Sequence, residues 1–302
     1  MSCPIVLASD EAYGMPLATA LRSIVDANQR WWPLDIHILA FGVSTSTRSR
    51  ISRSLPNGAA ELHWISIEQN QFDGLWTQDH ISRATYARLL IPELFPESAP
   101  KVLYLDSDIL VLGELAPLWD TDLGDAAVGA VLDGLDAQIK SGTSAVNDIP
   151  RVEHYFNAGV LLINLPKWRE RRISERALQY LEQNPKSPFS DQDALNVACN
   201  GAWKKLDPRW NFIDHYERTD IQCLAPERRP GIVHFATWRK PWNAKALSVN
   251  SAFFDSFRKR TQFARSRLDI SRDALRASWS LTKRGLRQFP AVRTVIRVVV
   301  RP

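Results

Sequence analysis

The stretch VLYLDSDILVLGEL, residues 102–115, decides the fold, because a run of strand-forming residues stops at two aspartates and then resumes. Residues 102–105 are typical of a buried parallel strand. Asp106 and Asp108 follow at once, and positions i and i+2 of an extended chain project to the same face. Two carboxylates held side by side repel each other, so the pair is costly unless a cation neutralises it. We therefore predict a metal site here. The alternative, capping of a following helix, accounts less easily for both aspartates.

Outside this stretch, strand-like and helix-like segments alternate along the chain. Apolar or alternating runs predict strands at residues 4–8, 34–41, 60–67, 126–133 and 156–165. Helical spacing and start signals predict helices across residues 17–25 and at 46–55, 82–94, 167–184 and 190–199, with Ser82 and Ser190 as caps. This alternation predicts an α/β fold with a mostly parallel central sheet flanked by helices. The polar residues 134–154 predict a long functional loop.

The composition is that of a globular protein with a sizeable core, since 45% of the 302 residues are apolar and 24% are charged. Cys3, Cys199 and Cys223 form no CxxC pair, which predicts neither a disulfide framework nor a zinc site and favours a reducing compartment. The N-terminus has no signal-peptide pattern, and no apolar run approaches the roughly 20 residues that span a bilayer. We therefore expect a cytoplasmic location.

The charge is unevenly distributed, because residues 258–302 contain thirteen Lys and Arg but only two Asp. This segment carries a formal charge of +11, so residues 1–257 carry −6 of the net charge of +5. Apolar residues between the basic ones are typical of an amphipathic helix on an anionic membrane surface. A solvated extension is the alternative, and nucleic acid is disfavoured because no recognition motif accompanies the charge. We predict a catalytic domain over 1–257 and a basic helical tail over 258–302 that binds the inner face of the cytoplasmic membrane.

Several acidic residues fall at the ends of predicted strands. In a doubly wound sheet, ligands bind beyond the carboxyl ends of the strands. The acidic strand ends are Asp10, Asp106, Asp108 and Asp133. Their common position predicts a polar site for a cation and its anionic ligand.

A further candidate ligand lies downstream in GIVHFATWRKPW, residues 231–242, where a short apolar run ends at His234. Neutral imidazole is a common metal ligand, although a lone histidine at a strand end is more often structural. Lys240 could reach a phosphate as a point charge. Two carboxylates and one imidazole without thiolates suit Mn²⁺, with Mg²⁺ as the alternative, and argue against structural zinc. Such a cation would stabilise a departing phosphate as a Lewis acid.

A set of motifs in fixed order identifies a resemblance. The segments are IVLASDEAY (5–13), HISRATYARL (80–89), KVLYLDSDILV (101–111), LAPLWDTDLGDAAVGAVLD (115–133), YFNAGVLLINLPKW (155–168), SDQDALN (190–196), RWNF (209–212) and HFATWRKPW (234–242). Together they resemble glycosyltransferase family 8, which has the GT-A fold, and in particular its bacterial lipooligosaccharide α-galactosyltransferases and glucosyltransferases. The resemblance implies retaining transfer of a hexose from UDP-galactose or UDP-glucose to a glycan acceptor, which we expect to be lipid-linked lipopolysaccharide core or a similar surface glycan.

The resemblance also implies roles for individual residues. The metal would be held against the diphosphate by Asp106, Asp108 and His234. The nucleotide and donor sugar would be bound by Ala8, Asp10, Tyr13, Arg88, Asp106, Ser107, Asp133, Asn157 and Lys240. Asp191 and Gln192 would line the sugar pocket and are the candidate catalytic residues.

Two positions depart from the family pattern. The first motif often has an Asn that contacts the nucleotide where this chain has Ala12. The motif HxxGxxKPW reads HFATWRKPW here, so Thr237 replaces a glycine that lets the backbone approach a phosphate. Thr237 and Trp238 therefore bear on the phosphate loop and on acceptor contacts, but neither removes a metal ligand.

The retaining step can follow two routes. Double displacement needs a carboxylate on the face of the sugar opposite the leaving group, and Asp191 is the acidic candidate. The resemblance places Gln192 near the reacting carbon, and an amide is a poor nucleophile. We favour the other route, front-face attack, in which the departing phosphate takes the acceptor's proton. A structural role at a helix N-terminus is the alternative for Asp191 and Asp193.

Two other functions stay open at this point. The sequence DSDIL also resembles the DxDx motif of haloacid-dehalogenase-type phosphatases, in which Asp106 would be the nucleophile. Against it, no convincing GDxxxD motif follows downstream. The other is a non-catalytic sugar-nucleotide-binding descendant, which Ala12 and Thr237 make conceivable.

Overall fold

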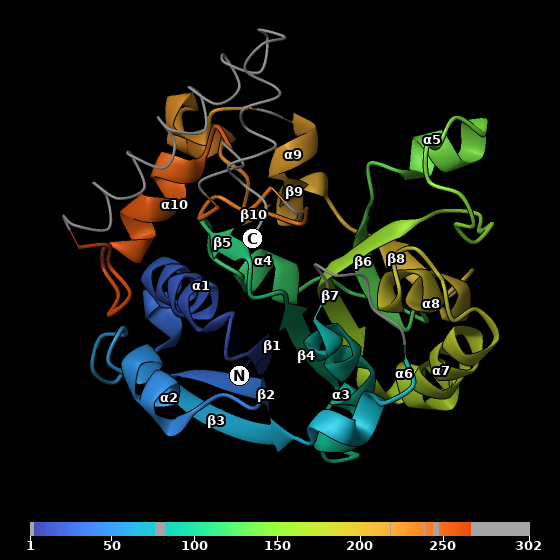
Figure 1. Cartoon of the computed structure of the whole chain (residues 1–302), viewed down its shortest axis with the longest axis horizontal. Helices are drawn as coiled ribbons and strands as arrows, with labels where there is room; N and C mark the ends of the chain where they lie inside the picture. Colours follow the sequence, from blue (N-terminus) through green and yellow to red (C-terminus); the bar gives the residue numbers. More distant parts are fainter. Residues whose placement is uncertain (1–2, 76–81, 218, 238, 244–247, 267–302) are drawn as a thin grey trace, which may run out of the picture.

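The computed structural model describes residues 3–75, 82–217, 219–237, 239–243 and 248–266. Two sheets form the framework of these residues. The larger sheet has seven strands in the order β3-β2-β1-β4-β7-β6-β8, and the smaller has three in the order β5-β10-β9. Figure 1 shows the larger sheet running from β3 at the lower left to β8 on the right, with the smaller sheet above its centre.

The predicted central sheet is confirmed, and most of its strand pairs are parallel. The exception is β7, which lies between β4 and β6 and is antiparallel to both. The strands of the larger sheet are β1 (Ile5–Asp10), β2 (Leu34–Phe41), β3 (Ala60–Ile67), β4 (Lys101–Leu105), β6 (Val128–Leu132), β7 (Phe156–Asn164) and β8 (Trp203–Lys205). Those of the smaller sheet are β5 (Ile109–Val111), β9 (Phe212–Ile213) and β10 (Ile232–His234). Because β1, β4 and β6 run in the same direction, their carboxyl ends meet at one edge, where β7 begins.

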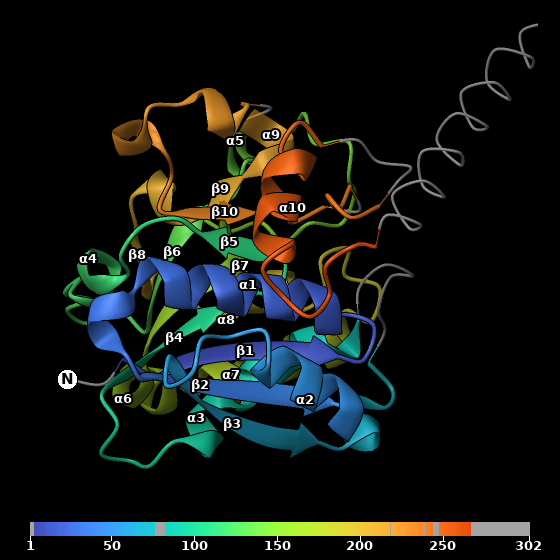
Figure 2. The same ribbon diagram turned by 90° about the vertical axis from the view of Figure 1, so that its left-hand side faces the viewer.

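Both faces of the larger sheet are buried at its central strands, which explains why these strands are apolar at nearly every position. In β1, Ile5 and Leu7 pack on one face, whereas Val6 and Ala8 pack on the other. The first face is covered by α1 (Gly14–Ala27), α4 (Ala116–Trp119) and strands of the smaller sheet. Figure 2 shows α1 lying between the two sheets. The second face is covered by η3 (Arg83–Leu90), α3 (Ile91–Leu94), α6 (Leu165–Glu170), α7 (Ile173–Gln183) and α8 (Asp191–Ala198).

The remaining helical segments lie at the periphery. The α-helices are α2 (Thr45–Ser52), α5 (Asp136–Ser141), α9 (Asp214–Glu217) and α10 (Ser251–Arg258). The 3₁₀ turns are η1 (Gln29–Trp31), η2 (Gln69–Phe72), η4 (Pro208–Trp210), η5 (Ile221–Cys223) and η6 (Pro226–Arg228). No helix in the described ranges is both long and apolar enough to cross a bilayer.

Several helix predictions need correction. The single helix predicted over 167–184 is two helices, α6 and α7, because Arg172 adopts a left-handed conformation with φ 53°. The helix predicted over 82–94 is mostly the 3₁₀ segment η3, although Ser82 caps it as expected by accepting a bond from the Ala84 N–H. Ser190 precedes α8 but makes no side-chain capping bond. The predicted loop 134–154 contains the short helix α5.

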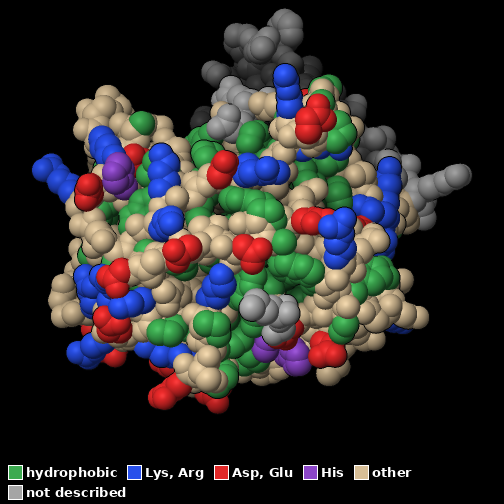
Figure 3. All heavy atoms as spheres, turned by 180° about the vertical axis from the view of Figure 1, so that it is seen from behind, with side chains coloured by type: hydrophobic (Ala, Val, Ile, Leu, Met, Phe, Trp, Pro, Cys, Tyr) green, Lys and Arg blue, Asp and Glu red, His purple; other side chains and the backbone are tan. Residues whose placement is uncertain are grey.

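The predicted tail begins on the surface of the body. Arg260 forms an ion pair with Asp26 of α1 at 2.6 Å, and the Gln262 N–H donates to Ser54 Oγ at 2.9 Å. Phe263 packs against the hydrophobic core under α1. Residues 267–302, on which the membrane prediction chiefly rests, lie outside the described residues. On the face in Figure 3, basic and acidic side chains of the body are interspersed, without a large field of one sign.

Candidate active site

A cavity of about 340 Å³ opens at the edge where β1, β4 and β6 end and β7 begins. Every site residue that the sequence predicted lines this one cavity. These residues are Ala8, Asp10, Tyr13, Arg88, Asp106, Ser107, Asp108, Asp133, Asn157, Asp191, Gln192, His234 and Lys240. The structure therefore brings together positions that lie far apart in the sequence, while their individual roles stay predictions.

The DSD turn explains why the apolar run of residues 102–115 is interrupted. The strand β4 ends where the Asp106 N–H donates to the Gly159 carbonyl of β7 at 2.8 Å. Ser107 Oγ then donates to the Ala8 carbonyl at 2.6 Å, which ties the turn to the end of β1. From Ile109 the chain continues as β5 in the smaller sheet. The aspartates thus sit at the crossing between two buried sheets, and the apolar residues resume because the second sheet is also buried.

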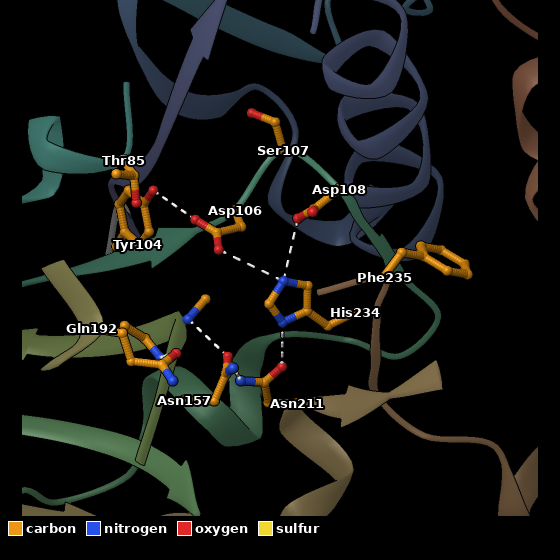
Figure 4. Close-up of polar contacts among 12 residues, drawn as sticks. Thr85, Tyr104, Asp106, Ser107, Asp108, Asn157, Gln192, Asn211, His234 and Phe235 are labelled. Atoms are coloured by element: carbon orange, nitrogen blue, oxygen red, sulfur yellow. Dashed lines mark hydrogen bonds and ion pairs between the residues drawn. The ribbon is translucent and has the colours of Figure 1, made fainter. Parts of the chain in front are cut away.

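Asp106, Asp108 and His234, which we call the cavity cluster, present one ligand atom each within 4.8 Å of one another. The antiparallel pairing of β10 with β5 places His234 opposite Ile109, directly after the second aspartate. His234 Nε2 lies 3.2 Å from Asp108 Oδ1 and 3.6 Å from Asp106 Oδ2 (Figure 4). Three convergent groups of this kind can coordinate one cation.

The partners of His234 indicate which ring nitrogen faces the aspartates as a ligand. Its Nδ1 lies 2.9 Å from Asn211 Oδ1, and Asn211 Nδ2 in turn donates to Asn157 Oδ1 at 2.8 Å (Figure 4). Because the Asn211 oxygen can only accept, Nδ1 carries the proton. In a neutral imidazole Nε2 then presents a lone pair to the carboxylates. A lone pair and two carboxylates repel one another unless a cation lies between them, so these residues fit a divalent metal ion.

Lys240 adds a positive charge to the cavity cluster. Its Nζ forms an ion pair with Asp108 Oδ2 and donates to the Phe235 carbonyl at 2.7 Å. Burial alone would raise the pKa of Asp108, but the charge of the Lys240 ammonium outweighs burial and holds this pKa well below its usual range. Asp108 is therefore a carboxylate at neutral pH, as a metal ligand must be.

Arg88 connects the cavity cluster to the helix α8. Arg88 is only 4% exposed, and its Nη2 donates to Asp106 Oδ1 at 2.9 Å. It lies over the Tyr104 ring at 4.6 Å, and the Tyr104 hydroxyl donates to the same Asp106 oxygen at 2.7 Å. Asp191 Oδ2 lies 3.0 Å from Arg88 Nε. Arg88 therefore orients Asp106, and its predicted contact with the donor stays a prediction.

Asp191 and Gln192 open α8 at the wall of the cavity. Asp191 is 3% exposed, accepts a bond from Thr85 Oγ1 at 2.6 Å, and has its pKa raised to about 6 by burial. Gln192 Oε1 accepts from the Ala158 N–H at 3.0 Å. Gln192 Nε2 reaches Asp133 Oδ2 at 3.4 Å. Both side chains thus already have partners within the protein.

Asp10, at the end of β1, is held by two hydrogen bonds from neighbouring loops. Asp10 accepts bonds from the Tyr13 N–H at 3.0 Å and from Ser82 Oγ at 2.6 Å.

Of the two departures from the family pattern, Ala12 is exposed and does not line the cavity, whereas Thr237 does line it. Trp238 lies outside the described residues. Thr237 is therefore the departure that bears directly on the site.

Two residues that support the site were not singled out from the sequence. A Cβ atom at Gly159 would lie 2.1 Å from His234 Cε1 and 2.8 Å from Asp106 Oδ2, so only glycine leaves room for the cavity cluster. A glycine inside an apolar strand is a signal for such a close approach. Asn211 is 3% exposed and orients His234, and nothing in its local sequence reveals that contact.

Comparison with known proteins identifies the family of this chain. The sequence model described as "Glycosyl transferase family 8" matches residues 4–246. Glycosyltransferase GlyF of Streptococcus pneumoniae serotype 4 is 33% identical over 249 residues, which cover 81% of this chain and 58% of that protein. Lipopolysaccharide 1,3-galactosyltransferase of Salmonella typhimurium is 26% identical over 251 residues, covering 81% of this chain and 74% of that protein.

A solved structure gives the same result for the fold. The galactosyltransferase LgtC, solved with donor and acceptor sugar analogs, superposes with a TM-score of 0.70 at 31% identity, covering 85% of this chain and 96% of that one. The predicted GT-A fold is confirmed by this match. The phosphatase alternative has no support among these matches and is set aside. By sequence and by structure, this chain belongs to glycosyltransferase family 8.

Proposed function

We propose that this protein is a retaining, metal-dependent hexosyltransferase that uses UDP-galactose or UDP-glucose and a surface glycan acceptor. The observation that carries this proposal is the cavity cluster, in which the imidazole Nε2 of His234 faces two carboxylates. Asp106, Asp108 and His234 would hold Mn²⁺, or Mg²⁺ in its place, and the cation would neutralise the diphosphate leaving group. Lys240 adds a second positive charge for the phosphates.

The size and lining of the cavity support a nucleotide-sugar donor. A volume of about 340 Å³ lies within the usual range for small-molecule sites. Asp10 at the end of β1 and Tyr13 just after it would bind the nucleotide, and Asp133 and Asn157, which are hydrogen-bonded to each other, would bind the sugar. The names of the LgtC and Salmonella proteins specify galactosyl transfer, which supports a hexose donor.

The surroundings of Asp191 support front-face attack. Its carboxylate is buried and engaged by Thr85 and Arg88, and the Gln192 amide oxygen is engaged by a backbone N–H. Neither is poised as a free nucleophile beneath the sugar. In the front-face route, the bond between the anomeric carbon and the diphosphate breaks while the acceptor oxygen bonds to the same face. The acceptor's proton passes to the departing phosphate oxygen.

A groove next to the cavity supports an anionic acceptor. It has a volume of about 460 Å³ and shares Ile213 and Tyr216 with the cavity. Its basic side chains are Arg209, Arg228 and Arg229, opposed in the groove by Glu227. This excess of positive charge suits a phosphorylated or otherwise acidic glycan such as lipopolysaccharide core. Transfer to a neutral oligosaccharide as fast as to its phosphorylated form would contradict this preference.

We further propose that the tail attaches the enzyme to the inner face of the cytoplasmic membrane, where a lipid-linked acceptor is found. Since residues 258–266 include side chains packed on the body, truncation after Ser266 is a cleaner test than removal from Arg258. The truncated protein should bind vesicles containing anionic lipid more weakly than the full chain and bind neutral vesicles equally weakly. Unchanged binding to anionic vesicles would remove the membrane proposal. The domain boundary at 257/258 is part of this proposal.

The catalytic proposal is tested by incubating the protein with UDP-galactose or UDP-glucose, with and without Mn²⁺. We expect slow release of UDP that requires the metal and accelerates when a glycan acceptor is added. Binding of the UDP-sugar without release, even with an acceptor pool present, would instead support the non-catalytic alternative. The sugar that gives the faster release identifies the donor.

A further inference from the structure

A second group of metal-ligand residues lies on the outer strands of the larger sheet, away from the cavity. The parallel register of β2 and β3 places His37 opposite His63, and Asp35 precedes His37 by two residues on the same face. We call Asp35, His37 and His63 the edge cluster. None of the three lines the active-site cavity.

The two imidazoles of the edge cluster converge on one carboxylate oxygen. His37 Nε2 lies 2.9 Å from Asp35 Oδ1, and His63 Nε2 lies 3.2 Å from the same atom. The rings stack with centroids 4.7 Å apart and an interplanar angle of 24°. Phe95 also packs against the His37 ring, with centroids 4.8 Å apart.

These distances match the ligand spacing of a small tetrahedral metal site. With zinc–nitrogen and zinc–oxygen bonds of roughly 2.0–2.1 Å, the ligand atoms stand about 3.3 Å apart. The three ligand atoms of the edge cluster all lie within 4.8 Å of one another, so small side-chain rotations would close the site. Two imidazoles and one carboxylate favour Zn²⁺ or a similar transition metal over Mg²⁺ or Ca²⁺.

The edge cluster is also open to solvent, as a site that loads metal from solution must be. The side chains of Asp35, His37 and His63 are 29%, 19% and 48% exposed. Three protein ligands leave a fourth position for water. Within the described sheet β3 pairs only with β2, so a bound ion would fasten the edge strand to its neighbour.

We propose that Asp35, His37 and His63 form a binding site for a transition-metal ion of the zinc class, separate from the catalytic cation. The ion would be coordinated by both Nε2 atoms and by Asp35 Oδ1, and would hold β3 in register with β2.

The test measures Zn²⁺ binding to untagged, metal-free full chain carrying Asp108→Asn, which weakens zinc binding in the cavity. Competition with a chromophoric chelator should show one tight zinc ion per chain. His63→Gln in this background should weaken that binding by at least about tenfold. The matched control is His154→Gln, because His154 is 49% exposed and also lies beside an aspartate, Asp136. Equal zinc affinity in the two histidine variants would overturn the proposal.

A second readout does not depend on affinity. Co²⁺ in a tetrahedral site of nitrogen and oxygen ligands gives a visible absorption band, which should appear in the Asp108→Asn protein and persist with His154→Gln. The band should be lost with His63→Gln and with Asp35→Asn, each of which should keep the circular dichroism spectrum of the parent. A band that survives in both variants, or that never forms in the parent, would show that the edge cluster is only a hydrogen-bonded triad.

Discussion

The cavity cluster and the edge cluster are built from the same residue types in opposite proportions, and they differ most in their surroundings. The cavity cluster has two carboxylates and one imidazole, and the edge cluster has one carboxylate and two imidazoles. His234 is 3% exposed in its side chain, whereas His63 is 48% exposed. The first composition suits a hard cation that binds phosphate, and the second suits zinc.

The surroundings explain why only one of the two clusters is suited to catalysis. Each ligand of the cavity cluster has a buried or half-buried partner that orients it: Arg88 for Asp106, Lys240 for Asp108 and Asn211 for His234. The edge cluster is fixed mainly by strand pairing and by ring packing on Phe95. A catalytic metal site requires oriented ligands beside a substrate cavity, and a structural site does not.

The largest difference should appear when one carboxylate is removed from each cluster. Asp108→Asn should reduce metal-dependent UDP release by about a hundredfold or more, because metal stabilisation of a leaving phosphate is worth several kcal/mol. Asp35→Asn should reduce release by no more than a few-fold. UDP release is measured at saturating Mn²⁺ and donor, with circular dichroism to confirm folding. Comparable losses in the two variants would break the distinction between the clusters.

The larger part of the fold was predictable because it depends on local apolar patterns. The strands β1, β4 and β7 are buried apolar runs, and β2 and β3 contain residues that alternate between more and less buried positions, so the positions of all five are visible in the sequence. The smaller sheet was not predicted. Its strands have two or three residues, and β5 pairs with β10 more than a hundred positions away. The helix break at Arg172 was also hidden, because a non-glycine residue with φ 53° has no local signature.

The candidate site was predictable where a residue's chemistry is visible at a strand end, and hidden where it depends on a distant contact. Asp106, Asp108 and His234 could be selected because acidic and imidazole groups end apolar runs. Asn211 lies in the motif RWNF (209–212), but its role could not be assigned, since that role comes from a bond to a ring 23 residues away. The edge cluster was missed for the same reason, because it exists only once the register joins His37 to His63.

A second difference between the clusters should appear in the pH dependence of stability. Arg88 ties the cavity cluster to Asp191, whose pKa is raised from 3.8 to about 6 by burial. Between about pH 4 and 6 the folded protein therefore binds more protons than the unfolded chain, so the free energy of unfolding falls as pH rises through this window. Asp191→Asn lacks this titration. Between pH 4 and 7, the free energy of unfolding of the wild type should therefore fall by up to about 3 kcal/mol relative to that of the variant.

Urea unfolding at a series of pH values measures this difference. Glu97→Gln, which changes an exposed acidic residue outside both clusters, is the control and should follow the wild-type curve. Parallel curves for the wild type and Asp191→Asn would mean that burial does not hold a proton on Asp191 in the folded protein. The link from the cavity cluster through Arg88 would then be a simple ion pair.

The smallest effect should come from removing an orienting partner while keeping every ligand. Asn211→Ala leaves His234 in place but removes the partner of its Nδ1–H, so the ring loses its fixed tautomer and angle, while Asn157 Oδ1 keeps the bond from the Gly159 N–H. The Mn²⁺ concentration for half-maximal UDP release should rise about 10- to 100-fold. Excess metal should restore most of the rate, because the three ligands are intact. Zinc affinity at the edge cluster should not change.

Asn196→Ala provides the matched control, because Asn196 is also buried but hydrogen-bonds the backbone of Phe156 instead of a cluster ligand. Both variants should unfold more easily than the wild type, since each leaves buried groups without partners. Only Asn211→Ala should shift the metal requirement. If the two variants needed the same Mn²⁺ concentration, His234 would not depend on Asn211 for its orientation. Orienting partners would then no longer separate the cavity cluster from the edge cluster, and burial and composition alone would have to explain the difference.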